Sequence, residues 1–226
     1  MAERAYCNWS SGKDAALALH EAMTSGDYEV LELFTVIRQD GGRVSMHEVG
    51  RELVQRQADS IGLPLHCFPL DLRAPAAYQT AMAREMAGFY ARGITTAIFG
   101  DICLEALRES REKRCAESGM RTAFPLWGQE PDILLERFLS LGFRAVITCV
   151  DAAVLDESFL GKVIDRDLLA RFPPGVNLCG ENGEYHSFVF DGPIFREPVP
   201  FRLGRRYYKD FSGRKGMERF WYVEIE

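Results

Sequence analysis

Apolar and polar positions follow two different periods along the first half of the chain. Short runs rich in β-branched and aromatic residues, typical of buried strands, are each followed by a segment whose apolar positions recur with a helical spacing. Strands are predicted at 5–9, 30–37, 65–70 and 96–100, and helices at 12–25, 46–61, 75–92 and 104–118. Repeated strand–helix units predict an α/β fold with a parallel sheet that helices cover on both faces.

The pattern changes after residue 127. One more helix is predicted at 132–141 and one more strand at 145–150, and the remainder is rich in glycine, proline and aromatic residues. We therefore expect two domains, an N-terminal one at 1–127 and a smaller C-terminal α+β domain at 128–226.

Composition narrows the class of protein. The chain has 226 residues, of which 47% are hydrophobic, enough for one substantial core or two small ones that share an interface. No apolar run is long enough for a membrane span, and the first residues lack the layout of a signal peptide, so a cytoplasmic location is expected. Six scattered cysteines without a Cys-x-x-Cys pair indicate reduced, mostly structural thiols.

The formal charge of −6 gives no overall attraction for a nucleic acid. A local cluster of basic residues near the C-terminus is interpreted as solvated faces of strands and turns. It consists of Arg202, Arg205, Arg206, Lys209, Arg214 and Lys215.

The stretch "YCNWSSGKDAALAL", residues 6–19, is the first candidate site. It predicts a strand, a loop and a helix, and free N–H groups with the positive end of the helix dipole favour an anion at such a helix N-terminus. Gly12 allows close approach of the backbone, Ser10 and Ser11 offer hydroxyl groups, and Lys13 supplies positive charge. We interpret the loop as a phosphate cradle.

The loop is not a Walker A motif. Cys7 stands where that motif needs a glycine, and Asp14 follows the lysine where the motif needs serine or threonine. The stretch instead resembles the PP-loop, Ser-Gly-Gly-Lys-Asp-Ser, of the N-type ATP pyrophosphatases. That superfamily cleaves ATP between its α and β phosphates.

Three further segments resemble the diphthine–ammonia ligase family, and the resemblance covers nearly the whole chain. They are "IFGDICLEALRESREKRCAESGMRTAFPLW" (98–127), "AVITCVDAAVLDESFLGKVID" (145–165) and "CGENGEYHSFVFDGPIF" (179–195). The third is the most specific. The resemblance implies an adenine-nucleotide α-hydrolase-like (HUP, Rossmann-like) ATP-binding domain at 1–127 and an acceptor-binding domain at 128–226. It also implies amide formation in which ATP adenylates a carboxylate, AMP and pyrophosphate leave, and ammonia is the nucleophile.

Candidate site residues follow from the motifs and the resemblance together. They are Ser10, Ser11, Gly12, Lys13, Asp14, Gly100 and Asp101 for ATP, Asp14 and Asp101 for Mg²⁺, Arg108, Arg111, Glu181, Glu184 and Tyr185 for the acceptor, and Lys13, Asp14, Glu184 and His186 for catalysis.

Each nominated residue also has a plainer interpretation. Asp14 is either a first-turn acid favoured by the helix dipole or a Mg²⁺ ligand, and these stand as equals. Asp101 ends a buried strand at the sheet edge where α/β folds bind ligands, although it could also cap the next helix.

The acceptor residues carry alternatives as well. Glu181 and Glu184 should repel unless a cation or basic partner lies between them, but exposed turn acids would look the same. His186 is a proton shuttle or a structural residue. Arg108 and Arg111 share a helical face and hold a carboxylate or phosphate, or form surface salt bridges.

The sequence departs from the family pattern at several positions. Ser11 replaces the usual second glycine of the PP-loop and Ala15 its last serine. His186 stands where diphthine ligases carry glutamate. We therefore expect a paralogous, bacterial-type subgroup that amidates a small free carboxylate better than a protein-borne one.

Two other function classes remain open. One is a non-catalytic adenine-nucleotide sensor, and the other is a tRNA-modifying PP-loop ATPase, against which the acidic charge counts. The expected partners are ATP, ammonia and a carboxylate acceptor, with neither membrane nor nucleic acid, and a homodimer is compatible with this set.

Overall fold

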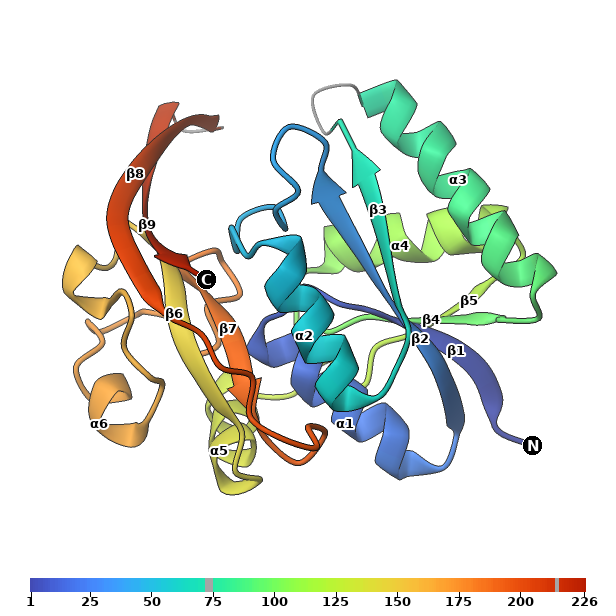
Figure 1. Ribbon diagram of the computed structural model, residues 1–226, viewed down its shortest axis with the longest axis horizontal. Helices are drawn as coiled ribbons and strands as arrows, with labels where there is room; N and C mark the ends of the chain where they lie inside the picture. Colours follow the sequence, from blue (N-terminus) through green and yellow to red (C-terminus); the bar gives the residue numbers. More distant parts are fainter. Residues whose placement is uncertain (72–74, 214–215) are drawn as a thin grey trace.

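A computed structural model describes residues 1–71, 75–213 and 216–226 (Figure 1). Its first half contains a five-stranded parallel sheet in the order β3-β2-β1-β4-β5. The strands are β1 (Glu3–Asn8), β2 (Tyr28–Arg38), β3 (Leu65–Leu70), β4 (Thr96–Ile98) and β5 (Arg121–Ala123). The predicted α/β class is confirmed, and the first strand is central.

Helices cover both faces of this sheet. They are α1 (Lys13–Ser25), α2 (Arg51–Ile61), α3 (Pro75–Ala91) and α4 (Glu105–Glu117). Neighbouring residues of β1 point to opposite faces of the sheet. Cys7 packs in the cluster formed with α1 and α2, and Tyr6 packs with Met86 and Phe89 of α3. Figure 1 shows α1 and α2 on the side that faces the second half of the chain.

The second half is built on a four-stranded antiparallel sheet in the order β7-β6-β9-β8. Its strands are β6 (Arg144–Asp151), β7 (Tyr185–Asp191), β8 (Leu203–Gly213) and β9 (Gly216–Ile225), and its helices are α5 (Pro131–Ser140), the 3-10 helix η1 (Glu157–Phe159) and α6 (Arg166–Leu169). Buried residues of α1 and α2 share one hydrophobic cluster with those of β6 and β7. The core is therefore continuous between the two halves.

One predicted helix begins five residues late. Helix α2 starts at Arg51 rather than at residue 46, and the preceding segment is a loop in which Met46 and Glu48 have φ angles of 62° and 53°. Such left-handed residues interrupt a right-handed helix. The short strand β5 was not predicted, and no bounds were predicted for the elements after β6. The other predicted elements agree with the structure to within a few residues.

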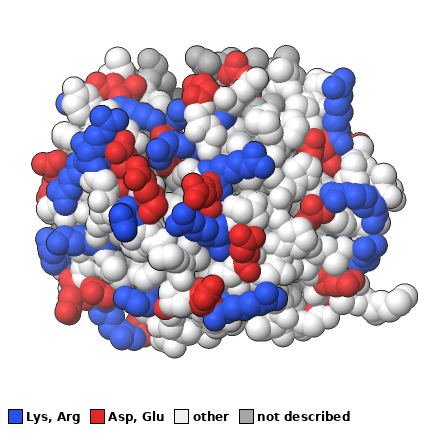
Figure 2. All heavy atoms as spheres, in the orientation of Figure 1, with Lys and Arg blue, Asp and Glu red and all other residues white. Residues whose placement is uncertain are grey.

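Figure 2 shows lysine and arginine mixed with aspartate and glutamate on this face of the molecule. Within the basic cluster near the C-terminus, Arg205 pairs with Glu224 and Lys209 with Glu48. Arg214 and Lys215 of that cluster lie outside the described residues. All six cysteines are free thiols, and no helix in the described part of the chain has the length and apolar character needed to cross a bilayer.

Candidate nucleotide site

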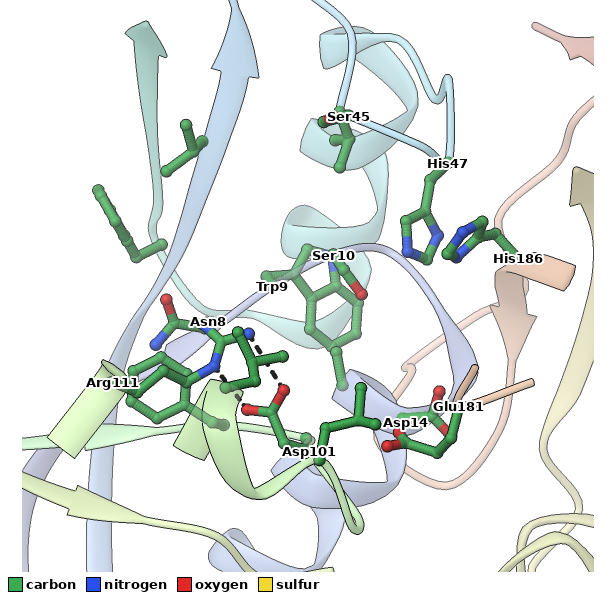
Figure 3. A pocket seen from close by; sticks show the side chains of 18 of the residues that line it. Asn8, Trp9, Ser10, Asp14, Ser45, His47, Asp101, Arg111, Glu181 and His186 are labelled. Atoms are coloured by element: carbon green, nitrogen blue, oxygen red, sulfur yellow. Dashed lines mark hydrogen bonds and ion pairs between the residues drawn. The ribbon is translucent and has the colours of Figure 1, made fainter. Parts of the chain in front are cut away.

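A cavity of about 450 Å³ lies at the carboxyl edge of the parallel sheet and is lined by both halves of the chain (Figure 3). The first half contributes the loop after β1, the end of β2 and helices α3 and α4, and the second half contributes the turn before β7. Of the sequence-predicted residues, the cavity is lined by Ser10, Lys13, Asp14, Gly100, Asp101, Arg111, Glu181, Tyr185 and His186. Residues far apart in sequence thus meet at the predicted edge.

The loop between β1 and α1 has the backbone of an anion site. Gly12 is the N-cap of α1, and no side chain caps the helix from that position. Ser11 has a φ angle of 72°, its side chain is fully buried, and its Oγ has no hydrogen-bond partner. Buried hydroxyl groups are normally paired, so this orphaned group is an exception; it lies next to Ser10, which lines the cavity, although Ser11 itself does not.

Gly100 is required by close packing against α1. A Cβ at this position would lie 2.8 Å from the carbonyl carbon of Asp14 and 2.9 Å from its oxygen. Because backbone atoms cannot yield as a flexible side chain does, only glycine lets β4 end this close to the first turn of α1.

The second half of the chain holds the loop in place. Lys13 N donates to Ser187 Oγ at 3.2 Å, and Val189 N donates to Ser11 O at 2.9 Å. Gln57 Nε2 donates to the same Ser11 carbonyl at 3.2 Å. Strand β7 therefore forms part of the wall around the candidate phosphate cradle.

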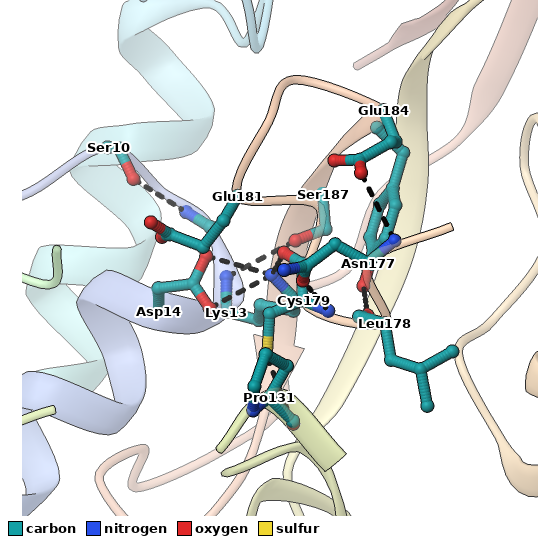
Figure 4. A network of polar contacts seen from close by, with 12 residues as sticks. Ser10, Lys13, Asp14, Pro131, Asn177, Leu178, Cys179, Glu181, Glu184 and Ser187 are labelled. Atoms are coloured by element: carbon teal, nitrogen blue, oxygen red, sulfur yellow. Dashed lines mark hydrogen bonds and ion pairs between the residues drawn. The ribbon is translucent and has the colours of Figure 1, made fainter. Parts of the chain in front are cut away.

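Lys13 is neither solvated nor free (Figure 4). Its residue is 3% exposed, and its Nζ donates to both carboxylate oxygens of Asp14, at 2.8 and 2.9 Å, and to the carbonyl of Cys179. The ammonium group also lies 5.0 Å from the centre of the Tyr185 ring. Burial alone would lower the pKa of Lys13, but the adjacent Asp14 carboxylate and Tyr185 outweigh it, so the pKa is raised and the lysine stays charged.

The two glutamates of the turn before β7 have different environments. Glu184 is 5% exposed and accepts hydrogen bonds from the backbone N–H groups of Asn177 and Asn182, at 3.1 and 2.9 Å. Its carboxylate thus closes its own turn and does not line the cavity. Glu181 lines the cavity beside Asp14 (Figure 4), and burial, followed by the Asp14 charge, raises its pKa. The two glutamates therefore lie in separate environments.

The two arginines predicted on α4 also separate. Arg111 forms two contacts with Asp101, at 2.7 and 3.1 Å, and both side chains line the cavity. Arg108 bonds to Glu112 at 2.7 Å, stacks 4.7 Å from the Trp127 ring, and is not among the lining residues.

Several lining residues were missed in the sequence. The polar ones include Asn8, Ser45, His47 and Arg114, and an apolar end of the cavity is formed by Phe34, Val36, Tyr78, Met82, Met86 and Phe99. Methionines at helical spacing on α3 look like ordinary core in a sequence, and only the folded sheet edge brings them to the cavity.

His47 comes from the loop that was predicted as helix. Its Nδ1 lies 2.9 Å from the carbonyl oxygen of Ser187, and its ring centre lies 4.8 Å from that of His186. Burial lowers the pKa of His47, and burial together with the neighbouring His47 lowers that of His186 further. Both imidazoles are therefore neutral near pH 7.

Comparison with known proteins places both halves of the chain in one family. The model of the diphthamide synthase N-terminal domain matches residues 3–122, and that of the diphthamide synthase C-terminal domain matches residues 130–223. Proteins named diphthine–ammonia ligase from Bos taurus and Homo sapiens are 24% and 25% identical over 219 residues, covering 84% of this chain and 79% of theirs.

A third diphthine–ammonia ligase, from Schizosaccharomyces pombe, is 26% identical over 211 residues and matches over 34% of its own length. A solved structure described as a predicted subunit of tRNA methyltransferase from Methanocaldococcus jannaschii aligns with a TM-score of 0.42 and 15% identity, over 66% of this chain and 79% of the other. With both domain models matched in order along almost its whole length, the chain belongs to the diphthamide synthase family.

Proposed function

We propose that the protein is an ATP-dependent carboxylate–ammonia ligase that releases AMP and pyrophosphate. Family membership supports a ligase that uses ATP. The observation that carries the proposal is the cavity at the N-terminus of α1, where Ser10, Lys13 and Asp14 meet charged groups from both halves of the chain. Beside them, the Ser11 hydroxyl is fully buried and has no hydrogen-bond partner.

The cavity accommodates a nucleotide in one orientation. Its volume of about 450 Å³ falls within the range of small-molecule sites. The apolar end between β2, α3 and β4 suits the adenine ring, with Phe34, Met86 and Phe99 against its faces. The triphosphate then runs to the Ser10–Lys13 loop, where backbone N–H groups and the Ser11 hydroxyl bind its oxygens.

The carboxylates of the cavity fit a magnesium ion. Asp14, Asp101 and Glu181 all line it, and the pKa of Glu181 is raised by burial and by the other two charges, a repulsion that a cation would relieve. No group of three or more His, Cys, Asp or Glu side chains in the described ranges could hold a metal alone. Mg²⁺ is usually held by one or two carboxylates and by phosphates, so phosphate oxygens of ATP would have to supply its remaining ligands. Asp14 and Asp101 would hold the ion, which would supply positive charge to the leaving pyrophosphate.

The proposed reaction has two steps, adenylation of the acceptor carboxylate and its amidation by ammonia, and different residues act in each. In the first, a carboxylate oxygen of the acceptor attacks the α-phosphorus, the bond to the β-phosphate oxygen breaks, and pyrophosphate leaves. In the second, the nitrogen of ammonia attacks the acyl carbon, AMP leaves, and the nitrogen loses a proton. Lys13 stabilises phosphate charge when it exchanges Asp14 for phosphate, Arg111 orients the acceptor, and Glu181, with its raised pKa, accepts the proton. Glu184 supports the turn that carries Glu181.

The test supplies ATP, ¹⁵N-ammonium and two kinds of acceptor, a panel of small free carboxylates and a diphthine-bearing elongation factor. We expect AMP and pyrophosphate in equal amounts, with ¹⁵N in the amide of a small carboxylate, and loss of both in Asp14→Asn. Release of ADP would refute the adenylation step. Amidation of the elongation factor alone would refute the preference for a small acceptor.

A nucleotide sensor is the second candidate, and one observation favours it. The Lys13 ammonium is already paired with Asp14 and the Cys179 carbonyl, so phosphate must displace an existing contact. Tight ATP binding without AMP release for any acceptor would select the sensor over the ligase.

A further inference from the structure

His47 is held between two strained residues. Met46 and Glu48 both have left-handed φ angles, which are unfavourable for non-glycine residues and persist only where surrounding contacts enforce them. Such strain gathers at functional sites, and here it fixes the direction of the imidazole between them.

The contacts that enforce this loop come from both halves of the chain. The Glu48 carboxylate is buried and pairs with Arg38 of β2 and with Lys209 of β8, the latter at 2.8 Å. Arg43 Nη1 also donates to the Glu48 carbonyl oxygen at 2.8 Å. Glu48, the residue that follows His47, is thus anchored by three cationic side chains.

The imidazole stands directly against the phosphate cradle. A Cβ placed on Gly12 would lie 2.6 Å from Cε1 of His47, so the ring occupies the space beside the N-cap of α1. Since Ser187 O can only accept, the 2.9 Å contact identifies Nδ1 as the protonated nitrogen of His47. Its Nε2 is left for another partner, and Figure 3 shows His186 beside the same ring.

The charged side chains that line the cavity do not by themselves give it the net positive charge that would favour a triphosphate. Its lining residues include three cationic side chains, Lys13, Arg111 and Arg114, and three carboxylates, so the formal charge is zero while both imidazoles are neutral. Lys13 and Arg111 are each paired with a carboxylate. The two histidines are the remaining groups beside the cradle that can become donors and cations.

We propose that His47 and His186 bind the terminal phosphates of ATP and thereby distinguish ATP from AMP. The inference rests on the ATP binding proposed above. In Figure 3, Asn8 and Arg111 lie on one side of Ser10 and the two imidazoles lie on the other. With the adenine ring at the apolar end of the cavity and the triphosphate along the Ser10–Lys13 loop, the β and γ phosphates would reach the imidazoles.

Proton uptake accompanies this contact. Because Nδ1 of His47 already donates to Ser187, its Nε2 becomes a donor to phosphate only when the ring is protonated. The charged groups that face the pair are Lys13, which opposes protonation, and Asp14, which favours it at His47. The added phosphate charge shifts the balance towards the imidazolium form, so ATP should bind more tightly as the pH falls towards 6.

The test uses His47→Asn and His186→Asn, with His66→Asn as the matched control. The asparagine amide at position 47 can still donate to Ser187 O, which preserves the structural bond and removes only Nε2. His66 pairs with Glu85 at 3.1 Å near the start of β3, and does not line the cavity. Calorimetry gives the Kd of ATP and of AMP for each protein, and the number of protons taken up is measured in buffers of different ionisation enthalpy.

Each histidine variant should weaken ATP binding by about tenfold to a hundredfold while changing AMP binding less than about twofold. It should also take up fewer protons per ATP bound than the wild type, and the control should match the wild type in all three quantities. Equal weakening of ATP and AMP would assign the pair a structural role, and unchanged ATP affinity would overturn the contact itself. A wild-type protein that binds no ATP would overturn the proposed function as well, whereas ATP binding without ligase activity leaves this test intact.

Discussion

Ser11→Gly should stabilise the protein and at the same time weaken its binding of ATP. Ser11 combines a left-handed backbone with a fully buried hydroxyl group that has no hydrogen-bond partner. Both features oppose folding of the free protein. Glycine relieves both, but it also removes the donor that we assign to phosphate.

The expected change in the free energy of unfolding is the sum of three contributions. The left-handed conformation costs a non-glycine residue about 1–2 kcal/mol, and an unpaired buried hydroxyl costs at least about 1 kcal/mol. About 1 kcal/mol of this stabilisation is lost again, because an unfolded chain with glycine at this position has more conformational entropy to lose on folding. The net gain is about 1–2 kcal/mol, which in a chain of this length raises Tm by roughly 2–8 °C.

Calorimetric unfolding without nucleotide measures the gain in stability. Titration with ATP measures the loss of affinity, and the Kd should rise about tenfold. Ser11→Ala is the matched control, because it removes the hydroxyl and keeps the strained φ angle. It should lose the same ATP affinity and gain about half the stability. A Ser11→Gly protein with a lower Tm than the wild type would refute the reasoning, because neither the strain nor the orphaned hydroxyl would then carry the stated cost.

Three further changes test the architecture around the loop. Gly100→Ala should destabilise by more than about 2 kcal/mol in urea unfolding, because its Cβ would meet the backbone of α1, whereas Gly88→Ala, with open space around it, should be neutral or slightly stabilising. Glu184→Gln should cost about 1–3 kcal/mol in the same assay, because its amide group would face backbone donors; an unchanged midpoint would contradict the turn-closing role. In the folded state the pKa values of His47 and His186 lie below the usual 6.5, so the folded protein binds fewer protons than the unfolded chain. The free energy of unfolding should therefore fall as the pH falls below 6.5. A variant with asparagine at both positions should lose less stability between pH 7.5 and 5.5.

The first sheet could be predicted because its determinants are local. Cys7 and Tyr6 lie on opposite faces of a strand with apolar cover on both sides, so the middle of β1, residues 5–7, is apolar on both faces, as expected of a central parallel strand. The loop before α2 could not be predicted in this way. Its apolar residues recur with a helical spacing, and the left-handed angles of Met46 and Glu48 are enforced by Lys209, more than 150 residues away in sequence.

The site was predicted in its location more than in its contacts. Lys13, Asp14 and Asp101 lie at the expected edge because a parallel sheet brings its loops to one end, and the turn before β7 adds Glu181 from the other half of the chain. The partner of each side chain depends on packing that a motif does not encode. Glu184 closes its own turn, and Arg108 stacks on Trp127 although it lies only three residues from Arg111.

Because the hydrophobic core is continuous between the two halves of the chain, both halves line the same cavity. The first backbone N–H of α1, at Lys13, is bonded to the Ser187 hydroxyl, and the carbonyl of Ser11 accepts from Val189, so strand β7 shapes the phosphate cradle as directly as β1 does. An acceptor held by the turn before β7 would therefore meet the nucleotide without a movement that closes one half on the other. In such an arrangement, selectivity for the proposed acceptor would reside in side chains held at fixed positions, such as Glu181, rather than in a closing movement.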